Sequence, residues 1–492
     1  MSAAIQSWEV WMPIGPKAMV PAILFVKMKP LIGMKGINLF KISAGFWLLF
    51  QALPVTAQRK EAEKSKSQPN VIIILTDDMG VGDISAFGGT IVPTPNIDKL
   101  AANGLKLTHY YSGAPICSPS RASILTGMHP GKWNFVTYLD KKSHNKDAEQ
   151  IDFLNPKAPS MARFFKNAGY VTGHFGKWHM GGGRDVTDAP KFDQYGIDEH
   201  ASTYESPEPD PLLTATNWIW SDKDSIKRWN RTAYFVDKTL DFMNRHRAQP
   251  CFVNLWPDEV HTPWVPKNDA GEETLKPQSE AAFKRVLQEY DIQIGRLIDG
   301  LKASGLLENT IIIFTSDNGA LPTFGSRSGG FRGSKLSLYE GGIRMPFIVS
   351  WPGHIPAGTT DDRSELHATD LLPTLSKLSG VTLPAAYQSD GVDRSAVLLG
   401  KPSFRKKEMF WEYGRNTIAY AYPKGTDKSP QLAIRSGEWK LLMNHDRSNV
   451  ELYNIIEDPA EASNVAATKA SKVNELSEKL LAWWKALPKL GE

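Results

Sequence analysis

Two polar clusters in the sequence offer oxygen ligands of the same chemical type. Asp77 and Asp78 follow a continuous β-branched apolar run, and Asp317 and Asn318 follow a second such run 240 residues later. Carboxylate and amide oxygens are the donors that Ca²⁺ or Mg²⁺ prefers, whereas Zn²⁺ favours His or Cys, which both clusters lack. A single Asp-Asp pair fits a solvated strand end equally well, but two matching clusters predict a divalent-cation site.

A possible nucleophile, Cys117, stands in a polar turn that leads into a helical pattern. It is therefore expected at a helix N-terminus, with Ser118 or Ser120 as the cap. Free N–H groups and the positive end of the helix dipole bind anions at such a position, and a thiolate beside that charge is activated. Arg121, one turn further on, is expected to point to the same place. The alternative is an unreactive cysteine in a surface turn.

Four further residues have types suited to anion binding and proton transfer. Lys177 and His179 stand two apart, so in an extended segment they share a face. His261 follows an apolar strand, and Lys335 lies in the Gly-rich stretch 329–342, whose composition makes it flexible enough to close over a ligand. For each residue taken alone, a structural role explains its presence better than a catalytic one.

The elements that must position these residues are those of an α/β protein. The apolar runs are typical of strands buried on both faces, and helical patterns stand between them at 94–103, 158–168, 231–246 and 279–304. This alternation predicts a large, mostly parallel sheet sandwiched by helices. The acidic clusters then lie at the carboxyl ends of strands, where ligands bind in such sheets.

The pattern of predicted elements changes after about residue 380. Short strand-like segments stand at 409–412, 432–435, 439–443 and 451–454, and an amphipathic helix follows at 470–487. We predict a catalytic domain over 69–380 and a smaller α+β subdomain over 381–492.

The N-terminal residues 1–57 are interpreted as a leader. From Met34 a basic start precedes the apolar run 42–53, and small residues up to Ala57 resemble a signal-peptidase site. A polar tail over 58–68 would begin the mature chain, without a stable membrane span, in a bacterial periplasm, at the cell surface or in the medium. The alternative is an N-terminal membrane anchor.

Composition excludes several classes of protein. The chain has 492 residues, enough for more than one domain, and only two cysteines, so it is no disulfide scaffold. Cys251 stands in an apolar run and is expected in the core. The net charge of +4 arises wholly within residues 1–57, where five lysines face one glutamate. The rest of the chain is neutral, which argues against nucleic-acid binding.

Taken together, these motifs resemble the type I, formylglycine-dependent sulfatase family of the alkaline phosphatase superfamily. The signature of that family is Cys-x-Pro-x-Arg, here Cys117, Pro119 and Arg121, continued by Leu125-Thr126-Gly127. The other matching segments follow in family order: 75–78, 176–179, 316–319, and Lys335 with 339–342. The resemblance implies an alkaline-phosphatase-like fold and covers nearly the whole chain after the leader.

The resemblance also implies cofactors and roles. A formylglycine-generating or anaerobic sulfatase-maturing enzyme would oxidise Cys117 to formylglycine, which hydrates to a diol. One Ca²⁺ would be held by Asp77, Asp78, Asp317, Asn318 and residue 117. Arg121 and Lys177 would stabilise the diol, and His179 would deprotonate it. His261 and Lys335 would bind the sulfate and the bridging oxygen, one of them acting as the acid for the leaving alcohol.

The resulting hypothesis is a secreted sulfatase that hydrolyses a sulfate monoester on a polysaccharide or glycosaminoglycan fragment. Two alternatives stay open: a formylglycine-dependent phosphoesterase or phosphonate monoester hydrolase, and a catalytically silent glycan-binding relative. The insert 183–230 and nearby residues supply aromatic and acidic side chains for a sugar: Tyr204, Trp218, Trp220, Trp256, Trp264, Asp185 and Glu205. Arg327 and Arg332 are predicted to hold a second sulfate or a uronate.

Overall fold

The central sheet is built from strands that have no polar face. In β1 (Asn70–Thr76) every residue is buried, and alternate side chains enter two different core clusters. Val71, Ile73 and Leu75 belong to one cluster, while Ile72 and Ile74 belong to the other. Since successive side chains of a strand point to opposite faces, the sheet must be covered on both sides.

The computed structural model of the protein describes residues 68–267, 278–416, 418 and 425–490. The predicted leader lies outside these residues, as does nearly all of the predicted polar tail. None of the helices within the described ranges is long and apolar enough to cross a membrane.

Nine strands form the main sheet, and the prediction of a mostly parallel sheet is confirmed. Their order begins β4-β3-β5-β1-β6-β7-β2-β8, and β9 also pairs with β2. Only β7 (Arg344–Ser350) runs antiparallel to its neighbours β6 and β2, and all other pairs are parallel. The remaining strands are β2 (Leu105–Tyr111), β3 (Val171–Gly176), β4 (Glu199–Ser202), β5 (Cys251–Trp256), β6 (Thr310–Ser316), β8 (Thr359–Asp361) and β9 (Leu366–His367).

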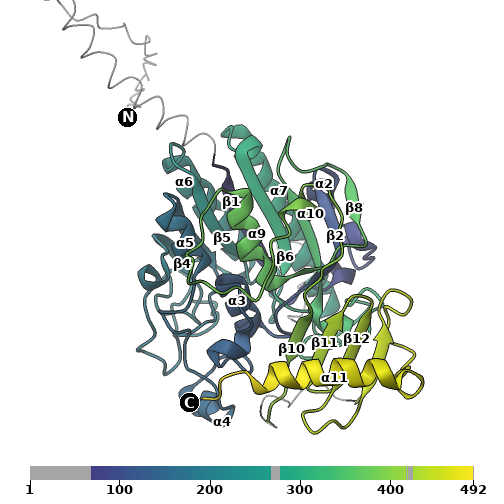
Figure 1. The fold of residues 1–492 in the computed structure, drawn as a ribbon. Helices are drawn as coiled ribbons and strands as arrows, with labels where there is room; N and C mark the ends of the chain where they lie inside the picture. Colours follow the sequence, from purple (N-terminus) through teal and green to yellow (C-terminus); the bar gives the residue numbers. More distant parts are fainter. Residues whose placement is uncertain (1–67, 268–277, 417, 419–424, 491–492) are drawn as a thin grey trace, which may run out of the picture. The chain divides into compact units, whose positions relative to one another are not determined.

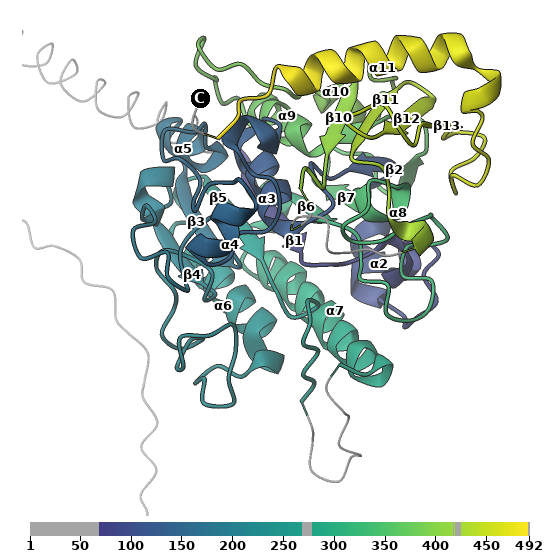
Figure 2. The ribbon, with the colours of Figure 1, turned by 90° about the horizontal axis from the view of Figure 1, so that it is seen from below.

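Helices cover both faces of this sheet, as Figure 2 shows. One face packs against α2 (Pro95–Ala102), α6 (Arg231–Arg245) and α7 (Glu280–Ala303). The other packs against α3 (Cys117–Thr126), α5 (Met161–Asn167), α9 (Leu371–Leu378) and α10 (Ser395–Leu398). Two short helices, α4 (Lys142–Asp147) and α8 (Glu340–Ile343), lie in the long connections. The bounds of the helices predicted at 94–103, 158–168, 231–246 and 279–304 agree with those of α2, α5, α6 and α7 to within a few residues.

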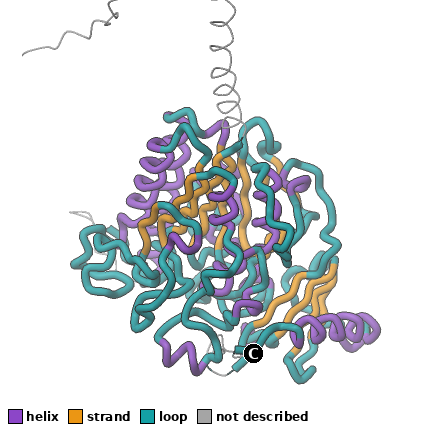
Figure 3. The backbone as a smooth tube through the Cα atoms, turned by 60° about the vertical axis from the view of Figure 1, so that its left-hand side comes forward, coloured by secondary structure: helices purple, strands orange, loops and turns teal. Residues whose placement is uncertain are grey.

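A second, antiparallel sheet follows toward the C-terminus, apart from the first in Figures 1 and 3. Its strands, in sheet order, are β10 (Met409–Glu412), β11 (Leu432–Ser436), β12 (Trp439–Met443) and β13 (Glu451–Asn454). One face packs against the apolar side of α11 (Ala470–Lys485). The other packs against Tyr111, Ile116 and Leu338. A smaller α+β unit is thus confirmed, while its boundary at 380/381 stays a prediction.

A buried ionic cluster joins this second sheet to helix α8 of the larger part of the molecule. The ammonium of Lys440 on β12 lies 2.9 Å from Glu340 on α8 and 2.9 Å from Glu461. All three side chains are inaccessible to solvent or nearly so. Burial raises the pKa of Glu461 to about 7, although Lys440 acts against this shift. The lysine therefore separates two buried carboxylates that would otherwise repel each other.

Replacement of Lys440 by methionine is expected to lower the free energy of unfolding by about 3 kcal/mol, because two buried carboxylates lose their shared cation. Urea denaturation of the purified protein measures the change. Lys401→Met, at an exposed position, serves as the control and is expected to change stability by less than about 0.5 kcal/mol. A Lys440→Met protein as stable as this control would contradict the account.

Candidate active site

The two acidic clusters meet because β1 and β6 are parallel neighbours. Thr76 pairs with Ser316 in register, so the residues that follow leave the sheet side by side. The backbone N–H of Asp78 donates to Asp317 Oδ1 over 3.2 Å, and Asn318 Nδ2 donates to Asp78 Oδ1 over 2.7 Å. The structure thus brings together all four oxygen ligands predicted from the sequence.

Three cations surround these carboxylates, each at close range. Arg121 donates from Nε and Nη2 to Asp317 Oδ2 over 3.0 and 2.7 Å. The ammonium of Lys177 lies 2.8 Å from an oxygen of Asp77. The ammonium of Lys335 lies 2.7 Å from Asp78. The Gly-rich segment around Lys335 thus holds this side chain buried against the acidic cluster.

Burial raises the pKa values of these carboxylates, and the neighbouring cations lower them. Burial by itself raises the pKa of Asp77, but Lys177, His261, Arg121 and Lys335 outweigh it and hold that pKa well below its usual value. For Asp317 burial prevails over Arg121, and its pKa is raised to about 8. Three carboxylates in one desolvated cluster thus hold more negative charge than their surroundings readily accept, which favours a bound cation.

The donor set fits a hard divalent cation. Asp77 Oδ1 and Asn318 Oδ1 are buried, and neither has a hydrogen-bond partner within the described chain. Ligand atoms of Asp77, Asp78 and His261 lie within 4.8 Å of one another. Oxygen donors suit Ca²⁺ better than an imidazole nitrogen does, so Asp317 and Asn318 remain the better candidates to complete the set.

Cys117 is the first residue of α3, as the sequence predicts, and it is 3% exposed. The predicted cap was wrong, because Ile116 occupies the cap position and no side chain bonds there. Instead, Ser118 Oγ accepts a hydrogen bond from the N–H of Leu139, and Ser120 Oγ is buried without a partner within the described chain. The start of α3 thus lacks a side-chain cap, which leaves its N–H groups available to a ligand.

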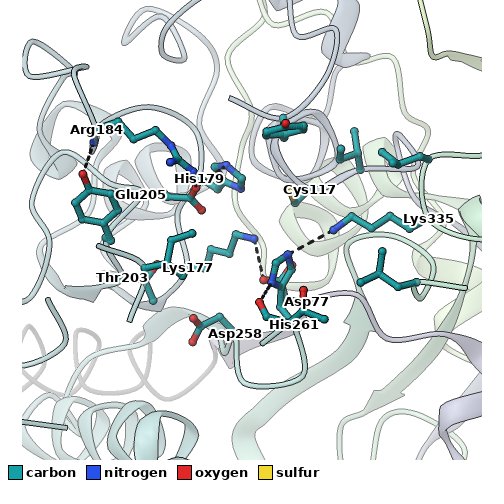
Figure 4. Close-up of a pocket in the computed structure, with 17 residues that line it drawn as sticks. Asp77, Cys117, Lys177, His179, Arg184, Thr203, Glu205, Asp258, His261 and Lys335 are labelled. Carbon is teal, nitrogen blue, oxygen red and sulfur yellow. Dashed lines mark hydrogen bonds and ion pairs between the residues drawn. The ribbon is translucent and has the colours of Figure 1, made fainter. Parts of the chain in front are cut away.

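A cavity of about 410 Å³ opens onto these groups. In Figure 4, Lys177 and Lys335 reach in from opposite sides toward Asp77 and His261, with Cys117 nearby. His179 also lines the cavity, whereas Arg121 and Asp317 are buried and are not among its lining residues. The rest of the wall consists of residues from loops, among them Tyr138, Arg184, Thr203, Tyr204, Glu205, Ile219, Leu321 and Leu336.

Contacts of the imidazole ring fix the orientation of the His179 side chain, and its backbone is not extended. Its φ of 53° shows that the predicted extended segment was wrong, although Lys177 and His179 do reach the same cavity. The ring Nε2 lies 3.0 Å from the carbonyl of Leu139 and 3.4 Å from Glu205 Oε1. Since a carbonyl only accepts, Nε2 carries the proton, and the buried Nδ1, unpartnered among the described residues, keeps its lone pair.

Burial lowers the pKa of His179 to about 4, although Glu205 acts in the opposite direction. The imidazole is therefore neutral near pH 7 and able to accept a proton at Nδ1. Glu205 itself is held by Arg184, whose Nη2 lies 2.8 Å from Glu205 Oε1. Glu205, predicted from the sequence as a sugar ligand, lines the cavity but also lies against His179, the candidate general base.

Several predicted substrate contacts are wrong. Arg327 is 3% exposed and pairs with Asp83, while Arg332 donates to the hydroxyl of Tyr453 over 2.9 Å and pairs with Glu451. Both arginines therefore hold structural elements together. Two of the predicted aromatic platforms, Trp256 and Trp264, are at most 1% exposed and belong to the cores.

Other predicted sugar contacts lie at or near the cavity. Tyr204 lines it, and Trp218, 47% exposed, packs against Tyr204 and beneath the Arg184 guanidinium. Arg184 was missed by the sequence analysis. A Gly-rich stretch, Gly181 to Gly183, precedes it and was the only signal of an unusual backbone there.

The fold is that of an α/β protein with a cluster of acidic and basic side chains in its cavity, and comparison with known proteins gives its family. The Sulfatase family model matches residues 69–381, and the model for the C-terminal part of N-sulphoglucosamine sulphohydrolase matches residues 331–486. The chain belongs to the sulfatase family and is a sulfuric ester hydrolase.

Named relatives and a solved structure agree with this assignment. The chain is 28% identical to N-acetylgalactosamine-6-O-sulfatase of Bacteroides thetaiotaomicron, over 86% of this chain and 94% of that protein. It is 30% identical to human N-acetylgalactosamine-6-sulfatase, over 69% and 67% respectively. The crystal structure of Ps i-CgsB in complex with k-i-k-neocarrahexaose matches with a TM-score of 0.72 at 23% identity, over 86% and 94%, which supports the fold.

Proposed function

We propose that this sulfatase removes sulfate from a sulfated sugar outside the cytoplasm, with Ca²⁺ and a formylglycine derived from Cys117. The observation that carries the proposal is the position of Cys117, at an uncapped helix start in a cavity that also exposes Lys177 and Lys335 beside a buried carboxylate cluster. We propose Asp77, Asp78, Asp317 and Asn318 as the residues that hold the ion. The predicted signal sequence supports export.

The cationic side chains match the needs of sulfate transfer. Negative charge on the sulfate oxygens increases toward the transition state, and preorganised cations in a desolvated cavity stabilise it. Lys177 and Lys335 line the cavity and are proposed for this role, while Arg121 orients Asp317 through a hydrogen bond. A hydrated aldehyde at residue 117 would supply the attacking oxygen and a second hydroxyl for the later release of sulfate, and Ca²⁺ held by the proposed ligands would polarise the sulfate oxygens.

Proton transfer is assigned to two sides of the cavity. His179 takes the proton at residue 117 through Nδ1. On the other side, His261 Nδ1 lies 2.6 Å from the carbonyl of Thr262, which places its proton on Nδ1 and leaves Nε2 as an acceptor. Lys335 Nζ lies 3.5 Å from that Nε2. Lys335 is therefore the proposed proton donor to the leaving alcohol, and His261 orients it.

For the substrate we propose a 6-sulfated N-acetylgalactosamine residue of a glycosaminoglycan fragment. The relatives named above act on this sugar, and the exposed aromatic ring of Trp218 next to Tyr204 offers a surface on which a sugar ring can stack. Arg184 is already paired with Glu205 and Asp140, so its guanidinium is not free to bind a second charged group.

The test is a comparison of kcat/KM for sulfate release from N-acetylgalactosamine 6-sulfate, its 4-sulfate isomer and an aryl sulfate, and of hydrolysis of an aryl phosphate monoester and diester. We expect the highest kcat/KM for the 6-sulfated sugar. A higher kcat/KM for the phosphate diester than for any sulfate ester would favour the phosphoesterase alternative. Binding of the sugar without turnover of any ester, by protein whose residue 117 is modified, would favour the silent glycan-binding alternative.

The pH dependence provides a separate prediction for Glu205. Activity of the unsubstituted enzyme needs neutral His179, so kcat/KM should fall as the pH drops toward about 4. Glu205→Gln removes the charge that favours the imidazolium, so the pKa of His179 falls further and the acid limb moves to lower pH. The weaker base also lowers the plateau by about tenfold. The pH profile of kcat/KM measures both effects.

Glu478→Gln is the matched control, because Glu478 on α11 has a largely exposed side chain, pairs with Arg447 and does not line the cavity. It should leave both the limb and the plateau unchanged. An acid limb in Glu205→Gln that stays in place or moves to higher pH would contradict the assignment of His179 as the base.

A further inference from the structure

A second cavity, of about 600 Å³, lies between α4 and the C-terminal end of α11. Figure 1 shows these two segments beside each other near the end of the described chain. Its lining consists of Lys146, Glu149, Arg415, Trp484, Lys485, Leu487, Lys489 and Leu490. Four of these residues are basic and one is acidic, in a chain that is neutral outside its leader. The positive charge is therefore local.

Part of the cavity wall is held rigidly. Arg415 donates twice to Glu412, over 2.9 Å each, and Trp484 Nε1 donates to the same carboxylate over 3.0 Å. The indole of Trp484 also stacks on His445, with ring centroids 4.3 Å apart. Glu412 thus fixes an aromatic ring and a guanidinium next to each other, a combination suited to sugar rings with acidic substituents.

The remaining charge is uncompensated on at least two lysines. Lys146 and Lys485 are exposed, and neither has an ion-pair partner within the described ranges. Glu149 is the single carboxylate among the lining residues. A ligand with several negative charges would therefore gain attraction without first displacing an internal salt bridge.

The segment that forms one side of this cavity also forms a wall of the active site. Tyr138 lines the active-site cavity, and its ring centroid lies 5.1 Å from that of His144 on α4. Asp140 pairs with Arg184 over 2.9 Å. Lys146 and Glu149 follow within the same stretch and face the second cavity. The segment from Tyr138 to Glu149 thus contributes side chains to both cavities.

We propose that the cavity between α4 and α11 is a second anion-binding site, which holds a distal sulfate or carboxylate group of a polymeric substrate. The inference rests on the proposed function for its choice of ligand, a sulfated oligosaccharide longer than the monosaccharide that is hydrolysed. The active site binds the scissile sulfate, and the basic cavity increases affinity for long, highly charged chains.

The test measures binding separately from hydrolysis. Calorimetry with Cys117→Ala protein and a chondroitin 6-sulfate hexasaccharide should show affinity about tenfold lower when Lys146, Lys485 and Lys489 are all replaced by alanine, and a smaller dependence on salt. The matched control replaces the exposed residues Lys99, Lys302 and Lys377 by alanine and should leave the affinity within twofold. An unsulfated chondroitin hexasaccharide distinguishes sulfate from carboxylate as the group that is held.

Turnover distinguishes this site from the active site. In mature enzyme, the triple substitution at Lys146, Lys485 and Lys489 should raise KM for the sulfated hexasaccharide and leave kcat/KM for an aryl sulfate within twofold. Equal hexasaccharide affinity in the triple variant and the unsubstituted protein, or an equal loss in the control, would overturn the proposal. If no ester is hydrolysed but binding still depends on these lysines, the proposed function fails and the second site stands.

Discussion

Replacement of Cys117 by alanine is expected to lower sulfate-ester hydrolysis by about 10⁴-fold or more, because residue 117 carries the proposed attacking oxygen. The fold should persist, since the side chain that is removed is small and lies at the first residue of α3. The measurement is kcat for an aryl sulfate, with protein produced alongside a sulfatase-maturing enzyme and with thermal unfolding as the check on folding.

The chain offers a matched control in its second cysteine. Cys251 begins β5, at the opposite end of that strand from the loop that carries His261, and burial raises the pKa of its thiol to about 12. Cys251→Ala removes a thiol of the same size and should retain activity within about threefold. If Cys117→Ala kept substantial activity, or if both variants lost it equally, residue 117 would not be the nucleophile.

Asp77→Asn is expected to weaken Ca²⁺ binding by at least about tenfold, because calcium affinity depends strongly on the number of charged ligands. Asp77 is fully buried, and its Oδ1 has no hydrogen-bond partner among the described residues, although Arg121 Nη2 lies 3.3 Å away; surrounding cations keep the pKa of Asp77 well below the usual value. Calorimetric titration with Ca²⁺ measures the effect in a Cys117→Ala background, so that the readout does not depend on turnover.

An equivalent loss of charge elsewhere should have no such effect. Asp237 on α6 has a largely exposed side chain and pairs with Arg296, so Asp237→Asn is the control and should bind Ca²⁺ as the unsubstituted protein does. A chelator should also lower the melting temperature of the unsubstituted protein, since an ion that binds only the folded state stabilises it. Unchanged Ca²⁺ affinity in Asp77→Asn would contradict the proposed ligand set.

Much of the fold followed from the pattern of apolar residues. The runs that became β1 and β6 are continuous and β-branched, and only a strand covered on both faces buries such a run completely. Their shared ending in acidic residues then predicted that Asp77 and Asp317 would meet, because adjacent parallel strands end at one edge of the sheet. The helices between them were recognised from their apolar periodicity.

The rest of the site depends on loop geometry, which carries no such periodicity. His179 adopts a positive φ and faces Leu139, a residue 40 positions away. Arg184 and Tyr138 enter the cavity from different connections, and nothing in their sequence neighbourhoods predicts that meeting. The same limit explains the wrong role for Arg332, whose charge suggested a substrate contact but whose partners, Glu451 and Tyr453, come from β13.

The most direct measurement is the mass of the proteolytic peptide that contains residue 117, taken from active enzyme made with a sulfatase-maturing enzyme. An aldehyde in place of the thiol lowers the peptide mass by a defined amount, and the account predicts that the modified fraction rises in proportion to specific activity. Full activity in protein whose Cys117 peptide keeps the mass of an ordinary cysteine would contradict it.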